Sequence, residues 1–354
     1  MARRYFGTDG VRGVVGADLT DNLVEQLGRA FASWRSGSVL VGRDTRSSGP
    51  YVESALVDGL VGAGAEVLRG GVLPTPAVAL LSTEHAAVVS ASHNPPEYNG
   101  VKFFTDAGRK LTDAEEEEIE SRLGRPVGGG GTSSDATGLA ERYVDLVCNR
   151  FGGPLEGLRV VLDCANGAMF EVAPITFERL GASVVTVGNS PDGVNINVGC
   201  GATDLRLLRE TVATGEFDFG VAFDGDGDRM LAVDARGNEI DGDQILAILA
   251  LHLGVDLVAV TEMTNLGFHR LMSERGVRVL TTAVGDRYVL EALRRERGVL
   301  GGEQSGHVIY LNGHTTGDGL VAALLLARAL VEQGVPLAEL AAVMPKLPQA
   351  RADV

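Results

Sequence analysis

The feature that most constrains the fold is a strand–helix–strand pattern that occurs three times along the chain. The first strands are expected at residues 39–41, 158–162 and 257–260, and the second strands at residues 66–68, 183–187 and 277–280. Glycine follows the intervening helix in every copy, as expected for a helix that ends in a left-handed C-cap. The pattern therefore predicts three tandem α/β units.

Each copy then ends in a polar loop between two further apolar strands. The three loops are residues 90–96, 224–229 and 302–307, and their compositions differ. Because ligands bind beyond the strand ends of α/β sheets, three equivalent loops facing one cleft would converge on one site. We therefore expect a mixed sheet in each unit and a cleft that the three units share.

Changes in composition place the boundaries between the units. Residues 125–137 include four consecutive glycines and are expected to be a flexible surface loop or linker. The predicted units are residues 1–137, 138–243 and 244–345, and residues 346–354 are expected to begin a connector. Before the glycines, Thr112 and Glu115 match a capping box, so the acidic run from Glu115 to Glu118 is interpreted as a solvated helix start and not as a metal site.

The loop Ser90-Ala91-Ser92-His93-Asn94-Pro95-Pro96 carries a candidate nucleophile. Its prolines keep it from continuing as helix or strand, so a serine hydroxyl here is expected to be exposed, held in place and close to a base. His93 follows directly, and Lys102 supplies a positive charge ten residues later. An ordinary polar turn is the alternative. Near the N-terminus, residues 6–13 place three glycines around Arg12, which favours a tight loop over a regular element.

The second loop, Asp224-Gly225-Asp226-Gly227-Asp228-Arg229, alternates three carboxylates with two glycines. Glycine lets the backbone turn tightly enough for the three side chains to approach one centre, and hard oxygen ligands select a hard divalent cation such as Mg²⁺. A calcium-binding EF-hand requires glutamate at its twelfth position, which is Ala235 here, and flanking helices where this loop has strands. Magnesium is therefore the predicted cofactor.

The third loop offers a carboxylate, an amide, a hydroxyl and an imidazole in Glu303, Gln304, Ser305 and His307. This set suits a polyhydroxylated ligand, although a surface turn would also explain it. Together, the three loops indicate phosphoryl transfer through a phosphoserine. No glycine-rich nucleoside-triphosphate loop occurs in the sequence, so ATP is not the expected donor.

Composition and charge narrow the class of partner. A net charge of −16 argues against nucleic acid, so a phosphorylated small molecule would need a local positive site. The three cysteines are odd in number and widely spaced, which favours reduced thiols in the cytoplasm. The N-terminus lacks a secretory signal, and the apolar runs 245–253 and 320–331 are too short to span a bilayer. We expect a cytoplasmic protein without a membrane partner.

Six motifs in order, at residues 6–13, 42–46, 90–102, 224–229, 284–289 and 302–307, resemble the α-D-phosphohexomutase superfamily over essentially the whole chain. Gln304 and residues 6–9 resemble its amino-sugar branch. The resemblance implies conversion of glucosamine 6-phosphate to glucosamine 1-phosphate through a 1,6-bisphosphate, feeding UDP-N-acetylglucosamine and cell-wall precursors. The alternatives are a mutase for mannose or glucose phosphates, or a sugar-phosphate-binding form without turnover.

The same resemblance implies roles for individual residues. Ser92 would carry the phosphate and bind Mg²⁺ together with Asp224, Asp226 and Asp228. Arg12, Lys102 and Arg229 would stabilise the charge of the transferring group, and either His93 or Lys102 would be the general acid/base. The sugar would be bound by Glu303, Ser305, His307, Gly285, Asp286 and Arg287. A homodimer is a possible assembly.

The chain also departs from the superfamily. Its members have a fourth, C-terminal domain whose Arg-x-Ser-Gly-Thr-Glu-Pro-like loop binds the phosphate that is not transferred. The sequence ends at Val354, and residues 344–354 resemble the connector to that domain. Because such contacts to the phosphate contribute affinity and orientation, the polypeptide of 354 residues is expected to have much reduced turnover or none.

Overall fold

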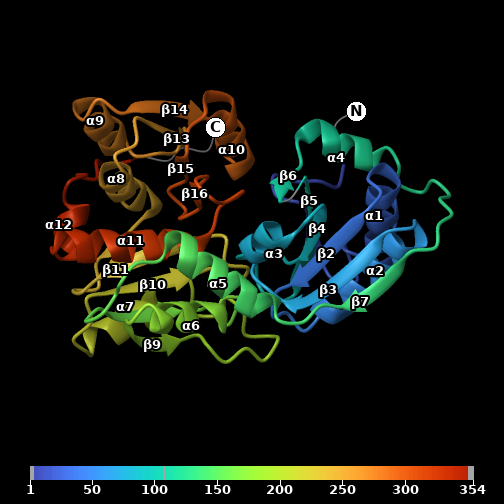
Figure 1. The fold of residues 1–354 in the computed structure, drawn as a ribbon, viewed down its shortest axis with the longest axis horizontal. Helices are drawn as coiled ribbons and strands as arrows, with labels where there is room; N and C mark the ends of the chain where they lie inside the picture. The colour runs from blue at the N-terminus through green and yellow to red at the C-terminus, as the bar shows by residue number, and fades with distance from the viewer. Residues whose placement is uncertain (1–3, 107, 350–354) are drawn as a thin grey trace.

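The computed structural model describes residues 4–106 and 108–349 and consists of three α/β units (Figure 1). Unit 1 is set apart on one side, and units 2 and 3 lie one above the other on the opposite side. None of the helices in the described part of the chain is long and apolar enough to cross a membrane. The predicted connector at 346–354 is described as far as Gln349, and its last five residues lie outside the described part, as does Met1–Arg3 of the N-terminus.

Unit 1 contains a seven-stranded sheet. Its second strand alternates between the two faces of the sheet, because Val39 and Val41 pack with α1 and α2, whereas Leu40 packs with α3. The strands are β1 (Val11–Val14), β2 (Ser38–Arg43), β3 (Glu66–Val72), β4 (His85–Val89), β5 (Tyr98–Thr105), β6 (Arg109–Lys110) and β7 (Thr132–Asp135); the helices are α1 (Asp21–Trp34), α2 (Gly49–Gly62), α3 (Thr75–Leu81) and α4 (Asp113–Glu120).

Two expectations for unit 1 are wrong. Arg12 does not lie on an irregular loop, because it belongs to β1, which pairs antiparallel with β5. Residues 125–137 are not wholly a flexible linker, because β7 adds to the sheet in parallel with β3. The glycines before β7 permit close backbone contact: a Cβ on Gly131 would lie 2.0 Å from the carbonyl oxygen of Ala65. Here the glycine run serves packing and not flexibility.

Unit 2 contains a five-stranded sheet between helices. Val161, Ala222 and Val233 face α7, and the opposite face of the sheet joins the largest apolar core of the protein. The strands are β8 (Arg159–Asp163), β9 (Ser183–Val187), β10 (Phe219–Phe223), β11 (Met230–Asp234) and β12 (Glu239–Ile240); the helices are α5 (Leu139–Phe151), α6 (Val172–Arg179) and α7 (Arg206–Ala213).

Unit 3 contains a four-stranded sheet and begins with a helix capped by Asp241. The boundary predicted between residues 243 and 244 therefore falls within the first turn of α8. The strands are β13 (Leu257–Thr261), β14 (Arg278–Thr282), β15 (Leu300–Gly302) and β16 (Val308–Tyr310); the helices are α8 (Gly242–Leu253), α9 (Leu266–Glu274), α10 (Asp286–Glu296), α11 (Gly319–Gln333) and α12 (Leu337–Ala341).

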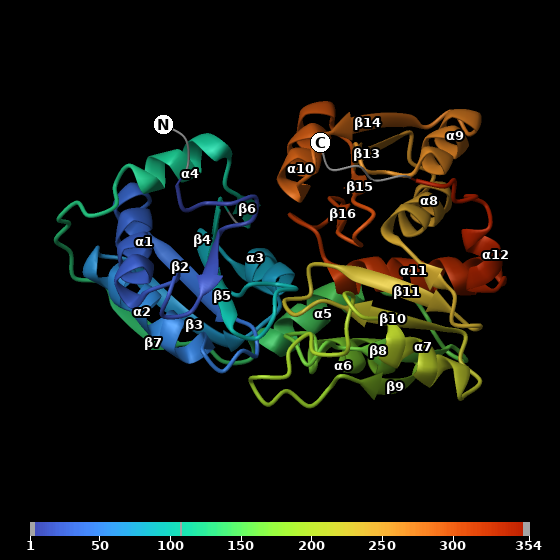
Figure 2. The same ribbon diagram turned by 180° about the vertical axis from the view of Figure 1, so that it is seen from behind.

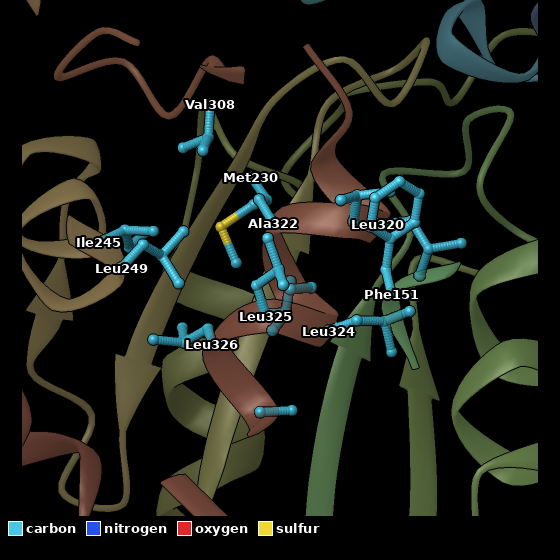
Figure 3. Close-up of a cluster of buried hydrophobic side chains, with 14 of the residues drawn as sticks. Phe151, Met230, Ile245, Leu249, Val308, Leu320, Ala322, Leu324, Leu325 and Leu326 are labelled. Atoms are coloured by element: carbon cyan, nitrogen blue, oxygen red, sulfur yellow. The ribbon is translucent and has the colours of Figure 1, made fainter. Parts of the chain in front are cut away.

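Helix α11 joins units 2 and 3. It runs between them in both views (Figures 1 and 2) and is apolar on most of its surface. Its leucines pack with side chains from both units, including Phe151 of α5, Met230 of β11 and Ile245 of α8 (Figure 3). A helix that is apolar over most of its surface is buried against its neighbours, so α11 fixes these two units against each other.

The predicted threefold repeat is present in the strand order. Each sheet contains the same four-stranded core, in which three parallel strands are followed by one antiparallel strand: β3-β2-β4-β5, β9-β8-β10-β11 and β14-β13-β15-β16. The three polar loops connect the last two strands of each core. They therefore occupy equivalent places at the strand ends, as the sequence predicted.

Candidate active site

Ser92 is buried, which contradicts the expectation of an exposed serine, although the loop becomes partly exposed from His93 onward. Ser92 has no exposed surface and a φ of +52°, in the left-handed region that is uncommon for residues other than glycine. Its backbone N–H donates to Ser90 Oγ at 2.9 Å, and Ser90 Oγ donates to Asp44 Oδ2 at 2.5 Å. The backbone strain is thus maintained by a buried hydrogen-bond network.

Arg46 holds the same loop from within unit 1. Its side chain is buried, pairs with Asp44 at 3.0 Å and donates to the carbonyl oxygens of Ser92 at 3.0 Å and Asn94 at 2.8 Å. Asn197 of unit 2 donates to these two carbonyls at 2.9 and 3.1 Å. Both units therefore fix the position of the loop.

The Ser92 hydroxyl faces the aspartate loop of unit 2. Its Oγ donates to Asp224 Oδ2 at 2.5 Å and lies 3.2 Å from His93 Nδ1. Close contact between the two loops depends on Gly225, because a Cβ there would lie 2.6 Å from the Ser92 carbonyl oxygen. The structure thus brings together the predicted nucleophile, a titratable ring and the first carboxylate.

The three carboxylates of Asp224, Asp226 and Asp228 form a buried cluster whose ligand atoms lie within 4.8 Å of one another. Burial raises the pKa of Asp224, and the neighbouring carboxylates raise it further. Among the described residues, Asp226 Oδ1 and Asp228 Oδ1 have no hydrogen-bond partner. Buried carboxylate oxygens that accept no hydrogen bond, in a set of hard donors, fit a divalent cation, so this cluster can hold a metal ion.

Neighbouring elements fix this loop. Thr75, at the start of α3 in unit 1, donates from Oγ1 to Asp226 Oδ2 at 2.6 Å. Gly319, at the start of α11, donates its N–H to the Gly227 carbonyl oxygen at 3.0 Å. Gly227 itself has a φ of +75°, which allows the tight turn between the aspartates. The loop is therefore held by all three units.

Lys102 is the central cation of the site. Its Nζ lies 2.6 Å from Asp9, 2.8 Å from Asp226 and 3.5 Å from Asp228. Burial alone would lower the pKa of Lys102, but Asp226, Asp9 and Asp228 outweigh burial and raise it. Lys102 is therefore a fixed positive charge beside the carboxylates of Asp226 and Asp228, in the cluster that can hold a metal ion.

Two arginines complete the positive side of the site. Arg12 pairs with Asp9 at 2.5 Å and donates to Asn94 Oδ1 at 3.3 Å. The backbone N–H of Arg229 donates to Asp224 Oδ1 at 3.1 Å. Burial, followed by the charges of Arg229 and Arg12, lowers the pKa of His93 to about 4, so its ring is neutral near pH 7.

The loop of unit 3 meets the aspartate loop through His307. Its Nδ1 lies 3.6 Å from Asp228 Oδ1 and its Nε2 lies 3.2 Å from Asp286 Oδ2. Burial would lower the pKa of His307, but these two carboxylates raise it to about 10. Glu303 accepts a hydrogen bond from the Gly285 N–H at 3.0 Å, and Ser305 is exposed on the loop.

Arg287 contacts protein side chains of unit 1. Its guanidinium pairs with Glu116 and Asp113 at the start of α4. The capping box of Thr112 and Glu115 is confirmed. However, the expectation of a wholly solvated acidic run is wrong for Glu116, which is buried because Arg287 covers it.

Sequence reasoning assigned no role to several residues that the structure places at the site. They are Asp9, Asp44, Arg46, Thr75, Lys110 and Asn197. For Lys110 a signal was available, because the sequence has three lysines among 31 basic residues and two of them lie at this site. Thr75 and Asn197 have no such signal, since each contacts the site across the boundary between two units.

Models of the phosphoglucomutase/phosphomannomutase family match most of the chain. The α/β/α domain I model matches residues 3–126, domain II residues 141–237 and domain III residues 241–347. A phosphoglucomutase/phosphomannomutase family protein from Burkholderia thailandensis has a similar fold, with a TM-score of 0.85, 29% sequence identity and coverage of 96% of this chain and 79% of that chain. The fold and the site thus define a phosphohexomutase, and the chain belongs to the phosphoglucomutase/phosphomannomutase family.

Curated relatives define the group within this family. The phosphoglucosamine mutase of Thermobifida fusca is 49% identical, over 99% of this chain and 83% of the relative. That of Streptomyces griseus is 51% identical, over 99% of this chain and 84% of the relative. The chain is therefore a member of the phosphoglucosamine mutases, which are isomerases. The resemblance drawn from the sequence motifs is confirmed.

A more distant structure shares the fold. Aspergillus fumigatus N-acetylphosphoglucosamine mutase, solved in complex with GlcNAc-6P and magnesium, has a TM-score of 0.68 at 16% identity and matches 98% of this chain and 80% of that chain. At this level of identity the likeness shows the shared fold.

Proposed function

We propose that this mutase works through a phosphoserine at Ser92 and uses glucosamine 6-phosphate as its substrate. The observation that carries the proposal is the contact between Ser92 Oγ and Asp224 Oδ2 at 2.5 Å, inside a buried site lined by cations. A phosphate on Oγ would lie beside the three aspartates and near Lys102, Arg12 and Arg229. These charges would offset the negative charge of the transferring group.

The proposed reaction has two transfers. Phospho-Ser92 gives its phosphoryl group to the sugar hydroxyl at position 1. The Oγ–P bond breaks, an O1–P bond forms, the hydroxyl proton ends on Ser92 Oγ, and the sugar becomes glucosamine 1,6-bisphosphate. The bisphosphate then reorients, and the phosphoryl group at position 6 passes to Ser92 Oγ: the O6–P bond breaks, an Oγ–P bond forms, and the Oγ proton ends on O6. The product is glucosamine 1-phosphate, and the enzyme regains its phosphate.

Mg²⁺ is the proposed metal, held by Asp224, Asp226, Asp228 and the phosphate of Ser92. When bound, it supplies positive charge that polarises the phosphoryl oxygens. Support comes from the hard oxygen donors of the cluster and from the magnesium named in the Aspergillus complex. Without a cation, burial and then the charges of Asp226 and Asp228 raise the pKa of Asp224, and a bound cation would offset this repulsion.

His93 is the proposed proton carrier, and Lys102 the proposed fixed charge. Both were candidates for the general acid/base. His93 Nδ1 lies 3.2 Å from Ser92 Oγ, within reach of a proton that moves at the reacting oxygen. Lys102 Nζ instead contacts three carboxylates, which suits charge stabilisation.

The sugar would bind against the loop of unit 3. Glu303 and Ser305 are the proposed contacts for its hydroxyl groups, and His307 would line the cleft. Gly285, Asp286 and Arg287 were also predicted to bind substrate, but Asp286 and Arg287 form ion pairs with protein side chains in this structure. The cytoplasmic location, the homodimer and the exact unit boundaries stay predictions.

Single-turnover transfer from phospho-Ser92 tests the proposed function. Protein phosphorylated with a sugar 1,6-bisphosphate is mixed with Mg²⁺ and the 6-phosphate of glucosamine, glucose or mannose, and loss of the phosphate is followed by intact mass. We expect glucosamine 6-phosphate to remove it fastest, and Ser92→Ala to take up no phosphate. Faster transfer to mannose or glucose 6-phosphate would reassign the substrate, and uptake of phosphate by Ser92→Ala would reject the nucleophile.

A further inference from the structure

Units 1 and 3 meet through a set of ion pairs at the start of α10. Lys110, on β6 of unit 1, pairs with Asp286, the first residue of α10. Arg287 pairs with Glu116 and Asp113 of α4 beside it. The side chains of Lys110 and Asp286 are 7% and 9% exposed. This contact therefore excludes most water from between the two units.

The same ion pair belongs to a closed ring of alternating charges, which we call the charge ring. From Lys110 Nζ, Asp9 lies at 2.9 Å, and Asp9 in turn lies 2.6 Å from Lys102. Lys102 contacts Asp228, and His307 connects Asp228 back to Asp286. The charge ring consists of Lys110, Asp9, Lys102, Asp228, His307 and Asp286, and every unit contributes at least one member.

We propose that Lys110 and Asp286 are positioning residues that hold unit 3 closed on unit 1 and thereby set the geometry of the phosphoryl-transfer site. Through Asp9, the position of Lys110 bears on Lys102, which contacts two of the metal-binding aspartates. Through His307, the position of Asp286 bears on Asp228. Closure of the cleft and placement of the charges that act on the phosphate are therefore one event. The link to catalysis rests on the proposed function, whereas closure itself does not.

At this contact the loss of hydration of the charged groups opposes their mutual attraction, which suits an interface that opens and closes. A buried ammonium or carboxylate loses hydration, and its partners offset this loss only while the units are together. When the units separate, water hydrates both groups again, and this hydration offsets part of the attraction that is lost. Because the ring holds an ion pair between units, raised salt should favour opening as the partners become exposed.

Lysine at position 110 is itself notable in this chain. Lys102, Lys110 and Lys346 are the three lysines among 31 basic residues, so arginine is the usual cation here. An ammonium is a compact point charge that can sit between two carboxylates. Two of the three lysines occupy the charge ring, each between carboxylates of different units or loops.

Small-angle X-ray scattering and hydrogen exchange of the full chain test closure. Lys110→Met should have a larger radius of gyration than the wild type and at least tenfold faster amide exchange at 286–290 and 113–116. Lys346→Met is the matched control, because Lys346 pairs with Asp241 at 2.8 Å away from the contact between units 1 and 3. The control should scatter like the wild type. An unchanged radius and unchanged exchange in Lys110→Met would overturn the proposal.

Single-turnover transfer from phospho-Ser92 tests the effect on catalysis. Lys110→Met should transfer at least tenfold more slowly at saturating glucosamine 6-phosphate, while Lys110→Arg, which keeps the charge, should recover most of the rate. The double variant with Asp286→Asn should be no slower than either single variant, since both remove one contact. Additive losses would show that the two residues act separately and would overturn the proposal.

Two outcomes separate this inference from the proposed function. If the wild type transfers nothing from Ser92, the proposed function fails, and scattering still decides whether Lys110 closes the cleft. If the wild type transfers phosphate, and Lys110→Met has the radius of gyration and the transfer rate of the wild type, the inference alone fails. Should Lys110→Met not fold, Asp286→Asn, which is nearly isosteric, is measured in its place with the same expected opening and the same overturning result.

Discussion

Replacing Arg46 by methionine removes the buried cation that holds the Ser92 loop. The Arg46 side chain is buried, and it serves both the Asp44 carboxylate and the carbonyl oxygens of Ser92 and Asn94. Removing one partner of a buried ion pair typically destabilises a protein by about 3–5 kcal/mol. With a urea dependence of about 2 kcal/mol per molar, the unfolding midpoint should fall by about 2 M.

Trp34 gives a direct readout of this change. It is the single tryptophan of the sequence and lies at the end of α1 in unit 1, with its ring 6.1 Å from that of Phe31. Its fluorescence during urea unfolding therefore reports the unit that contains Arg46. Arg29→Met is the control, because Arg29 pairs with Glu25 on the surface of α1 and should contribute less than about 1 kcal/mol.

The pH dependence supplies a second check on the same variant. Burial raises the pKa of Asp44 even though Arg46 opposes the shift, so the pKa should rise further in Arg46→Met. A folded-state pKa above the unfolded value makes stability fall as pH rises through that window. The stability gap to the wild type should therefore narrow as pH falls from 7 toward about 4, the ordinary aspartate range. An equal loss of stability in Arg46→Met at pH 7 and at about pH 4, or a loss of stability no larger than that of Arg29→Met, would refute this account of the Ser92 loop.

Three further changes test the metal loop and its surroundings. Mg²⁺ at about a hundred times its dissociation constant should stabilise the wild type by about 2.7 kcal/mol in thermal unfolding. Asp226→Asn should lose most of this stabilisation. Equal stabilisation of both proteins by Mg²⁺ would contradict the proposed metal site. Gly319→Ala should destabilise the protein by about 1–3 kcal/mol and weaken Mg²⁺ binding, because the added Cβ would lie 2.6 Å from the Arg229 carbonyl oxygen. Unchanged stability and unchanged Mg²⁺ binding would show that α11 does not fix the aspartate loop. In metal-free buffer, the stability advantage of the wild type over His307→Asn should shrink from pH 7 to 10. Burial would lower the pKa of His307, but Asp286 and Asp228 outweigh burial and raise it to about 10. A stability advantage that stays constant over this range would contradict the charged state of His307.

The repeated units could be predicted from the sequence because their signals are local. Short apolar strands, helix-ending glycines and the positions of the polar loops follow from periods and turn residues within each copy. The equivalence of the three loops then follows from the strand order. The cluster of Asp224, Asp226 and Asp228 was predictable for the same reason, since its ligands lie within five residues.

Features that depend on contacts between units could not be predicted in this way. Ser92 is buried because Asp224 and Gly225 of unit 2 cover it, and nothing in residues 90–96 records that contact. Glu116 looked solvated on its own helix, and its partner Arg287 lies 171 positions further along the chain. The glycines before β7 suggested a linker because close backbone packing and flexibility select the same residue.

Phosphate on Ser92 is the most direct test of the central claim. Purified protein is measured by intact mass and peptide mapping after incubation with Mg²⁺ and a sugar 1,6-bisphosphate, and again after addition of glucosamine 6-phosphate. The account predicts one added phosphate on Ser92 that glucosamine 6-phosphate removes as the 1,6-bisphosphate. A protein that takes up no phosphate, or that carries it on another residue, would contradict the claim.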